Sequence, residues 1–155
     1  MTALQLLNNG LLASASSYVG YNGYNQGDNR IFIWNPYKGL LFATLSSHTN
    51  YVTCLEQLNN GLLASGSRDS TIKIWNTTTS SLVATLAGHN NTINNLNILS
   101  NGNLASSSVS KGSLYVWDTY TFKLLYKLNG HQDKITDINN LQFNKPRNRL
   151  KLVDY

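Results

Sequence analysis

Tryptophan and histidine recur along this chain at one shared spacing, and this spacing limits the possible folds more than any other feature. Successive members of each set lie 41 and then 42 residues apart: Trp34, Trp75 and Trp117, and His48, His89 and His131. The segments between the markers differ, for example NPYKGLLFAT after Trp34 and NTTTSSLVAT after Trp75. A fixed spacing through variable sequence indicates one structural unit repeated along the chain.

The stretch from Gly61 to Trp75 shows what each unit contains. Residues 62–67 and 71–75 are predicted to be two short strands, the second being rich in β-branched and aromatic side chains. Arg68-Asp69-Ser70 between them supplies the residues of a tight turn, so the two strands form a hairpin. A repeat of about 40 to 45 residues with four short strands is typical of a propeller blade.

The sequence therefore predicts an all-β fold of β-propeller blades, each of four antiparallel strands. We expect a single segment of three complete blades and the start of a fourth, forming an open or partial propeller, over residues 2–45, 51–86, 92–128 and 134–155. Asn-Gly pairs mark the first turn of each complete blade. The first blade is irregular, since Ala13 and Ile31 are 18 residues apart where Ala64 and Ile72 are 8 apart, which indicates an insertion in its second turn.

With these features the chain resembles the WD-repeat family of β-propellers. The resemblance rests on the Gly-His pairs at 88–89 and 130–131, the segment LASGSRDSTIKIWN and the Trp117-Asp118 dipeptide, and it covers nearly the whole chain. In that family a His, a Ser or Thr, an Asp and a Trp form a buried hydrogen-bond network in each blade. The resemblance implies one complete network here, in the second blade: His48, Ser65 or Ser67, Asp69 and Trp75.

The other two networks are expected to be incomplete. The third repeat keeps His89, Ser106 or Ser108, and Trp117, but Ser110-Lys111 stands where Asp69 would be. The first repeat keeps Asp28, Ser14 or Ser16, and Trp34, without a preceding His. A hydrolase would use the same residue types, but a catalytic set occurs once and this one recurs, so we interpret it as structural and predict no enzyme.

Neither a metal site nor a cofactor site is expected. The histidines lie a full blade apart and Cys54 is the single cysteine, so no pair has the spacing of zinc ligands. The glycine-rich run GYNGYNQGD lacks the Lys-Ser/Thr and the helix of a phosphate-binding loop. Cys54 lies in an alternating apolar run and is interpreted as a small buried thiol.

Charge and hydropathy favour a soluble intracellular protein, cytoplasmic or nuclear. No apolar run approaches the roughly 20 residues of a membrane span, and the N-terminus does not resemble a secretory leader. The net charge is +5, with the surplus toward the C-terminus. These basic residues are spread over several expected strands without interleaved aromatic residues, so solubilising charge is favoured over a nucleic-acid footprint.

The function predicted from these features is a non-catalytic protein–protein interaction scaffold whose rim loops bind a peptide or protein. The alternative is a nucleic-acid-associated or RNA-processing complex subunit that uses the basic third repeat and the C-terminal tail. Tyrosines among Gly and Asn are typical of binding loops, although the inserted loop could also contact nothing. The candidate contact residues are Tyr18, Tyr21 and Tyr24 in the insertion, Arg68 beside the turn, and Tyr51, Thr92 and Lys134 before first strands.

Ring closure is a separate question. Propellers typically close with four to eight blades, because each blade buries its faces against neighbours on both sides. Three blades therefore need either missing blades or self-association to complete a ring. We favour a fragment of a longer propeller, and the two alternatives are a pair of copies sharing one ring and an open arc with adapted ends.

Overall fold

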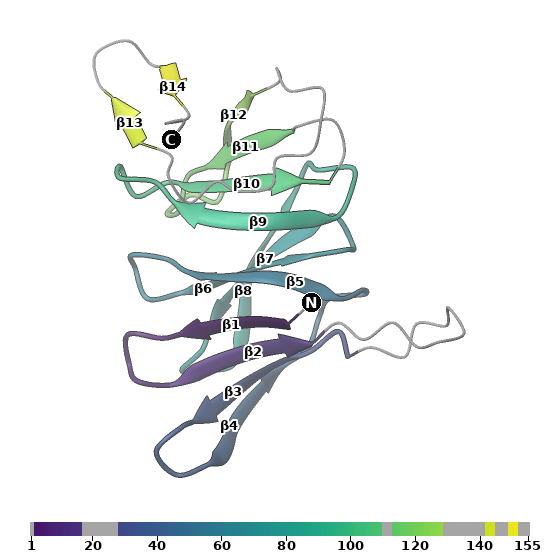
Figure 1. The fold of residues 1–155 in the computed structure, drawn as a ribbon, viewed down its shortest axis with the longest axis vertical. Coiled ribbons are helices and arrows are strands. Elements are labelled where there is room, and N and C mark those ends of the chain that lie inside the picture. Colours follow the sequence, from purple (N-terminus) through teal and green to yellow (C-terminus); the bar gives the residue numbers. More distant parts are fainter. Residues whose placement is uncertain (1, 17–27, 110–112, 129–141, 145–148, 152–155) are drawn as a thin grey trace.

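Three four-stranded antiparallel sheets lie next to one another and form the body of the protein (Figure 1). The computed structural model describes residues 2–16, 28–109, 113–128, 142–144 and 149–151. Within each sheet the strands follow one another in chain order, as the sequence predicted for propeller blades. Blade 1 contains β1 (Thr2–Leu6), β2 (Leu12–Ser16), β3 (Ile31–Asn35) and β4 (Leu40–Leu45). Blade 2 contains β5 (Val52–Gln57), β6 (Leu63–Ser67), β7 (Thr71–Asn76) and β8 (Ser81–Ala87), and blade 3 contains β9 (Ile93–Ile98), β10 (Leu104–Ser108), β11 (Leu114–Trp117) and β12 (Leu124–Leu128).

Beyond blade 3, two short strands pair antiparallel: β13 (Gln142–Asn144) and β14 (Arg149–Lys151). The sequence placed the first strand of a fourth unit at 135–141, which lies outside the described residues. It also suggested an irregular strand from residue 150, and β14 covers the start of that stretch.

The first turn of each blade has the same backbone conformation in all three repeats. The N–H of Gly61 donates to the carbonyl of Leu58 at 2.9 Å, and the N–H of Leu58 donates to the carbonyl of Leu62 at 2.8 Å. Gly10 and Gly102 occupy the same place in blades 1 and 3, and all three glycines have φ between 81° and 85°. A side chain is strained at such φ values, which explains the Asn-Gly pairs.

A β-bulge lies beside the tryptophan in every blade, between the tryptophan and the residue before it. The pairing between the third and fourth strands shifts at Trp34, at Trp75 and at Trp117. The extra residue on the outer strand is Phe42, Val83 or Leu125, and each of these side chains is exposed. A bulge increases the local twist of the sheet, so the three outer strands turn in the same way at the same place.

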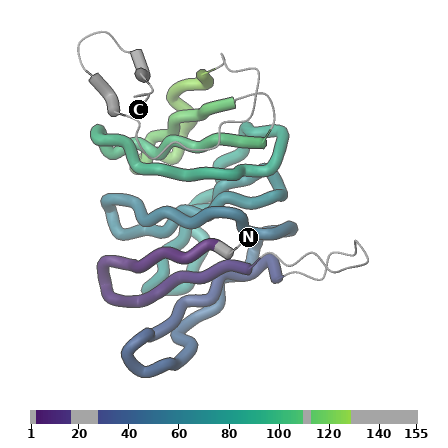
Figure 2. The backbone as a smooth tube through the Cα atoms, in the orientation of Figure 1, coloured from purple at the N-terminus to yellow at the C-terminus, as the bar shows by residue number. Residues whose placement is uncertain are grey.

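Apolar side chains fill the two interfaces between blades. The innermost strands β1, β5 and β9 lie side by side, and Figure 2 shows the three blades following one another along them. Leu55, Leu63 and Trp75 of blade 2 pack against blade 1, and their counterparts Leu96, Leu104 and Trp117 of blade 3 pack against blade 2. Trp75 and Trp117 therefore both anchor a polar network and close an interface.

Blades 2 and 3 approach each other closely at Gly66. A Cβ at Gly66 would lie 2.6 Å from both Cys54 Sγ and Ile93 Cγ2. The register gives Ala15 and Ser107 the same place in blades 1 and 3, so a small residue is kept in all three repeats. Small side chains at this position allow neighbouring blades to approach closely.

The outer face of blade 1 is exposed where its counterparts are buried. Leu4 is 63 % exposed, whereas Leu55 and Leu96 at the same register are 8 % and 3 % exposed. In blades 2 and 3 the preceding blade covers this face, so a neighbouring blade is what would bury Leu4. Within the described ranges there is no helix long and apolar enough to cross a membrane.

Candidate functional site

The polar network of blade 2 joins four side chains from four segments. His48 Nδ1 lies 2.7 Å from Asp69 Oδ2, and His48 Nε2 lies 2.8 Å from Ser65 Oγ. Trp75 Nε1–H donates to the same Ser65 oxygen at 2.8 Å. His48 comes from the loop before β5, Ser65 from β6, Asp69 from the β6–β7 turn and Trp75 from β7. The network therefore ties a loop, two strands and a turn together.

The direction of two hydrogen bonds in this network follows from the chemistry of the groups. An indole N–H can only donate and an ionised carboxylate can only accept. Ser65 therefore accepts from Trp75, and Asp69 accepts from His48 Nδ1–H. Ser65 Oγ also lies 2.8 Å from His48 Nε2 and 3.4 Å from the carbonyl oxygen of Lys73, so both lie within reach of its hydroxyl hydrogen.

Ser67, the alternative to Ser65, has another role. Its Oγ accepts from the N–H of Asp69 at 3.0 Å and donates to the carbonyl of Asn50 at 2.9 Å. Ser67 thus holds the turn against the preceding loop, while Ser65 alone reaches His48 and Trp75.

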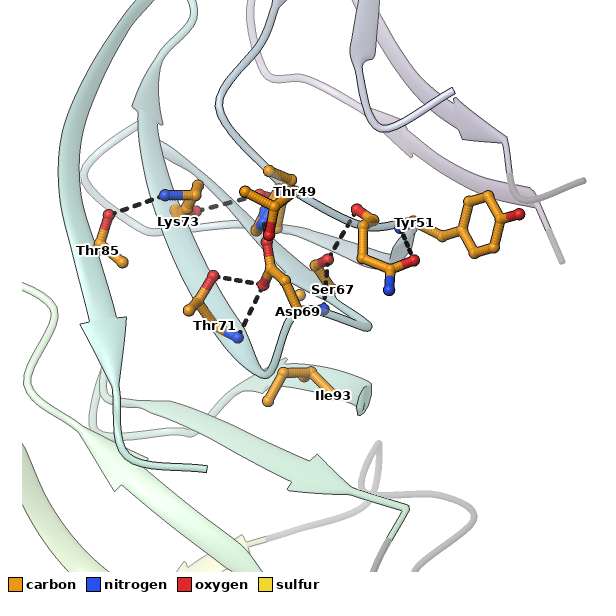
Figure 3. A network of polar contacts seen from close by, with 12 residues as sticks. Thr49, Tyr51, Ser67, Asp69, Thr71, Lys73, Thr85 and Ile93 are labelled. Carbon is orange, nitrogen blue, oxygen red and sulfur yellow. Dashed lines mark hydrogen bonds and ion pairs between the residues drawn. The ribbon is translucent and has the colours of Figure 1, made fainter. Parts of the chain in front are cut away.

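Four donors surround the Asp69 carboxylate. Besides His48, it accepts from the N–H of Thr49 at 3.0 Å and from both the N–H and the hydroxyl of Thr71, at 2.9 and 2.6 Å. Figure 3 shows Thr71 donating to Asp69 with Thr49 close by. Burial alone would raise the pKa of this carboxyl, but the hydrogen bonds from His48 and Thr71 outweigh it and hold the pKa well below its usual range. Asp69 is therefore an ionised structural group.

Lys73 lies beside this network, and its carbonyl oxygen is 3.4 Å from Ser65 Oγ. Its side chain is buried and its Nζ donates to Thr85 Oγ1 of β8 at 3.2 Å (Figure 3). The register places Tyr115 and Lys127 at these two positions in blade 3. Sequence reasoning did not single out any of these residues, although their fixed distance from the tryptophan was a signal that could have found them.

Blade 3 keeps part of the network. Ser106 Oγ accepts from Trp117 Nε1–H at 2.8 Å and lies 2.8 Å from His89 Nε2, as in blade 2. His89 Nδ1 is buried and has no hydrogen-bond partner among the described residues. The imidazole instead stacks on Tyr115, with ring centroids 3.9 Å apart. Ser106 therefore belongs to the network, and Ser108, the alternative, does not.

The surroundings of His89 keep it neutral. Burial, and then the positive charge of Lys127, lower the pKa of His89 to about 4. Lys127 Nζ lies 5.0 Å from the centre of the Tyr115 ring, a cation–π distance. The stack of His89, Tyr115 and Lys127 replaces the Lys73–Thr85 pair of blade 2.

Blade 1 differs from what the sequence predicted. Trp34 Nε1–H donates to Ser14 Oγ at 2.8 Å, but Asp28 is bound by Arg30 through two contacts of 2.7 Å. The structure records no hydrogen bond between Asp28 and Ser14 or Trp34 within the described ranges, so Asp28 does not join that Ser–Trp pair. The Arg30 guanidinium lowers the pKa of the Asp28 carboxyl by hydrogen bonding. Asp28 nevertheless accepts from the N–H of Arg30 at 3.0 Å, as Asp69 does from Thr71, so it closes the same turn despite the insertion.

The β6–β7 turn, the loops before β5 and β9, and the strand ends from which the β2–β3 and β10–β11 connections start lie at one edge of the blades, which we name the rim. The N–H of Arg68 donates to the carbonyl of Tyr51 at 2.8 Å, and in blade 3 the N–H of Val109 donates to the carbonyl of Thr92 at 3.0 Å. These equivalent bonds hold each turn against the loop beside it.

The candidate contact residues differ in how exposed their side chains are. Arg68 is exposed, Thr92 is half-buried, and Tyr51 is only 4 % exposed. Figure 3 shows the Tyr51 ring pointing away from the polar network. The remaining candidates, Tyr18, Tyr21, Tyr24 and Lys134, lie outside the described residues.

Among the described residues, the buried hydroxyl groups of the networks are held within the blades. Ser65 and Ser106 are fully buried, and each is already engaged by a tryptophan and a histidine. Burial raises the pKa of the Cys54 thiol to about 12, which leaves it unreactive as a nucleophile at neutral pH. Within the described ranges no three His, Cys, Asp or Glu side chains are grouped to hold a metal ion.

Comparison with known proteins gives the same fold. The family model described as WD domain, G-beta repeat matches residues 39–76 and 80–118. The structure of U3-55K is similar with a TM-score of 0.73 and 24 % identity, over 85 % of this chain and 40 % of that one. The crystal structure of the RRP9 WD40 repeats is similar with the same score and identity, over 85 % and 39 %. The chain thus spans about 40 % of the length of these structures, and at this identity the likeness concerns the fold. No curated protein matches the sequence.

Proposed function

Because the chain belongs to the WD-repeat family, we propose that it is a non-catalytic scaffold whose rim binds a protein or peptide partner. Proteins of this family generally serve as protein-interaction scaffolds. The buried serines and histidines are engaged within the blades, so the rim supplies exposed side chains such as Arg68 for contacts.

The observation that carries this proposal is the paired backbone bonding at the rim. The bonds from Arg68 to Tyr51 and from Val109 to Thr92 fix the turns and loops of blades 2 and 3 at equivalent positions. A rigid backbone supports recognition, because fewer conformations are lost on binding. The exposed Arg68 side chain stands on this backbone, and arginine is enriched at interfaces.

The insertion of blade 1 also carries candidate contact residues. It connects β2 to β3, the same connection that carries Arg68 between β6 and β7 in blade 2. Its tyrosines therefore enter the proposed surface together with Arg68, and the Gly and Asn residues between them suit adaptable contacts.

A peptide selected by display against the purified chain provides the test. Replacing Tyr18, Tyr21 and Tyr24 together by Ser should weaken peptide binding at least tenfold and leave the Tm nearly unchanged, since contact area is lost without loss of core. Arg68→Ala should weaken binding in the same way.

Two exposed tyrosines give the matched control. Tyr37 and Tyr120 are 87 % and 77 % exposed and lie in the β3–β4 and β11–β12 turns, at the edge opposite the rim. Replacing both by Ser should leave peptide affinity unchanged. Equal losses in the two tyrosine variants, or a large drop in Tm for the loop variant, would contradict the proposal.

The nucleic-acid alternative rests on the basic third blade and the C-terminal tail. The side chains of Lys123 and Lys127 are exposed on blade 3, and most basic residues of the tail lie outside the described ranges. Binding of single-stranded RNA that weakens steeply with salt, at a slope corresponding to several phosphates, would favour this alternative over the scaffold.

A further inference from the structure

Blade 2 shows what holds a carboxylate at the rim of this protein. Asp69 is bound by His48 Nδ1, by the N–H of Thr49, and by the N–H and hydroxyl of Thr71. These donors belong to residues that lie beside the β6–β7 turn in space, and the Asp69 carboxylate lies among them. The same four donors would bind a carboxylate that came from elsewhere.

Blade 3 has the equivalent donors at the equivalent positions. His89 corresponds to His48, since each histidine lies 17 residues before the serine to which its Nε2 bonds. Asn90 follows His89 as Thr49 follows His48, and Ser113 precedes Tyr115 by two residues as Thr71 precedes Lys73. Ser113 also keeps a hydroxyl like that of Thr71. The set therefore contains one imidazole, two backbone amides and one hydroxyl.

The backbone around these donors matches blade 2. The bond from Val109 to Thr92 repeats the bond from Arg68 to Tyr51, and the contacts of Ser106 with Trp117 and His89 repeat those of Ser65 at 2.8 Å. The sequence, however, has Ser110-Lys111 where Asp69 would be, so this turn supplies no carboxylate of its own.

Two buried polar atoms of blade 3 lack partners at this turn. His89 is 8 % exposed and its Nδ1 has no partner among the described residues. Ser108 is fully buried and its Oγ also has none there, whereas the equivalent Ser67 Oγ accepts from the N–H of Asp69. Both atoms are counterparts of groups that bond to Asp69 in blade 2, and an unpaired buried polar group is destabilising.

The hydrogen on His89 is available to an acceptor. Trp117 can only donate to Ser106, and the hydroxyl hydrogen of Ser106 is donated to His89 Nε2. The neutral imidazole therefore carries its own hydrogen on Nδ1, the atom without a partner in the described part of the chain.

The local charge favours an anion. Lys127 is exposed and its Nζ lies 5.0 Å from the centre of the Tyr115 ring, on which His89 stacks at 3.9 Å. The described part of this cluster holds no acidic side chain: it consists of His89, Asn90, Ser108, Ser113, Tyr115 and Lys127. An approaching carboxylate would meet donors and a positive charge without competition from an acid.

We propose that the donors of blade 3 around His89 form a carboxylate-binding site, which takes an Asp or Glu side chain of the protein partner in the place that Asp69 fills in blade 2. The proposal rests on the rim being the partner-binding surface. It adds the chemistry of one contact: an acidic side chain inserted at the β10–β11 turn, bound by His89 and the neighbouring amides.

Acetate is the probe that tests the site without a partner. In an NMR titration of the purified chain at pH 7, with chloride as the control for ionic strength, the Nδ1–H signal of His89 should shift saturably toward that of a hydrogen-bonded imidazole. His48 is the internal control, because Asp69 already occupies its Nδ1. An unchanged His89 signal, or an equal response of His48, would overturn the proposal.

Two variants sharpen this result. Lys111→Asp introduces a carboxylate two residues before Ser113, as Asp69 lies two residues before Thr71, and should abolish the acetate response and raise the Tm. Lys127→Gln keeps the donors and removes the nearby charge, so it should weaken acetate binding several-fold with a small effect on the Tm. An acetate response that survived in Lys111→Asp with the same affinity would place the bound anion elsewhere.

A pair of small ligands connects the site to a protein partner. N-acetyl-aspartate amide should bind at least tenfold more tightly than N-acetyl-asparagine amide, because only the former offers a charged acceptor. Equal binding of the two would overturn the assignment to an acidic side chain. An acetate response without loss of peptide binding in the tyrosine and Arg68 variants would instead leave the site standing and refute the rim proposal.

Discussion

Trp75 and Ser65 are joined by an N–H···O hydrogen bond of 2.8 Å, and the same bond at the same distance links Trp34 to Ser14 and Trp117 to Ser106. This Trp–Ser pair is present in all three networks, whereas the histidine and the aspartate are not present in every one. It is constant because a buried indole N–H needs an acceptor, and each tryptophan also faces the preceding blade or the open side of blade 1.

Removing the shared serine should therefore have unequal effects. Ser65→Ala leaves both Trp75 Nε1–H and His48 Nε2 without a partner in a fully buried place, and we expect a loss of about 2–3 kcal/mol. Ser14→Ala removes only the bond to the half-buried Trp34 and should cost about 1 kcal/mol. Urea unfolding of the two variants measures the difference, and equal losses would contradict the account of the networks.

Asp69 should be the most sensitive position of its turn. Asp69→Ala removes the acceptor of four hydrogen bonds, from His48, Thr49 and Thr71, and should lower the free energy of unfolding by about 2–4 kcal/mol. Ser110→Ala in the third hairpin should cost much less. Thermal unfolding compares the two, and equal shifts in Tm would show that the complete network adds nothing to stability.

The fold could be predicted from the sequence because the same pattern of residues occurs in three repeats. The Trp and His spacing and the Asn-Gly turns predicted three four-stranded blades, and the strands lie within a residue or so of the expected places. The complete network was predicted as well, but spacing could not separate Ser65 from Ser67, since both are buried serines on one strand. The hydrogen bonds show that Ser65 is the one that contacts His48 and Trp75.

The differences between repeats were harder to predict. Asp28 was expected in the network of blade 1, and it pairs with Arg30 because that arginine stands where blade 2 has Thr71 and reaches the same carboxylate. The stack of His89 on Tyr115 was also missed, since it depends on cross-strand neighbours that a linear pattern does not show.

The free energy of unfolding should decrease in two steps as the pH is lowered. The folded-state pKa of His89 is lowered to about 4 by burial and by Lys127, against about 6.5 in the unfolded chain. The unfolded state therefore binds a proton between these values and the folded state does not, so the free energy of unfolding should decrease by up to about 3 kcal/mol as the pH falls from 7 to 4. Asp69, whose pKa is lowered in the folded state, keeps its contribution above about pH 4 and loses it below.

Urea unfolding at several pH values checks the first step, with Lys127→Gln as the comparison. Lys127 faces His89 across Tyr115, and removing its charge should raise the pKa of His89 and flatten the dependence between pH 7 and 4. A free energy of unfolding that does not change over this interval would show that His89 is not held neutral in the folded state.

Gly66 should tolerate no side chain. The Cβ of Gly66→Ala would lie 2.6 Å from Cys54 Sγ and from Ile93 Cγ2, so blades 2 and 3 would have to separate, at a cost of about 1–3 kcal/mol. Gly61→Ala is the matched control, because it has open space around its Cβ and strains only a backbone with φ of 85°.

Adding Ile93→Ala to each variant separates the steric clash at Gly66 from the backbone strain at Gly61. It should recover part of the loss at Gly66, where the clash is relieved, and none at Gly61, and a double-mutant cycle by thermal unfolding measures this coupling. Zero coupling between Gly66 and Ile93 would show that the added Cβ does not clash with Ile93. Close approach of the two blades would then not explain the glycine at this position.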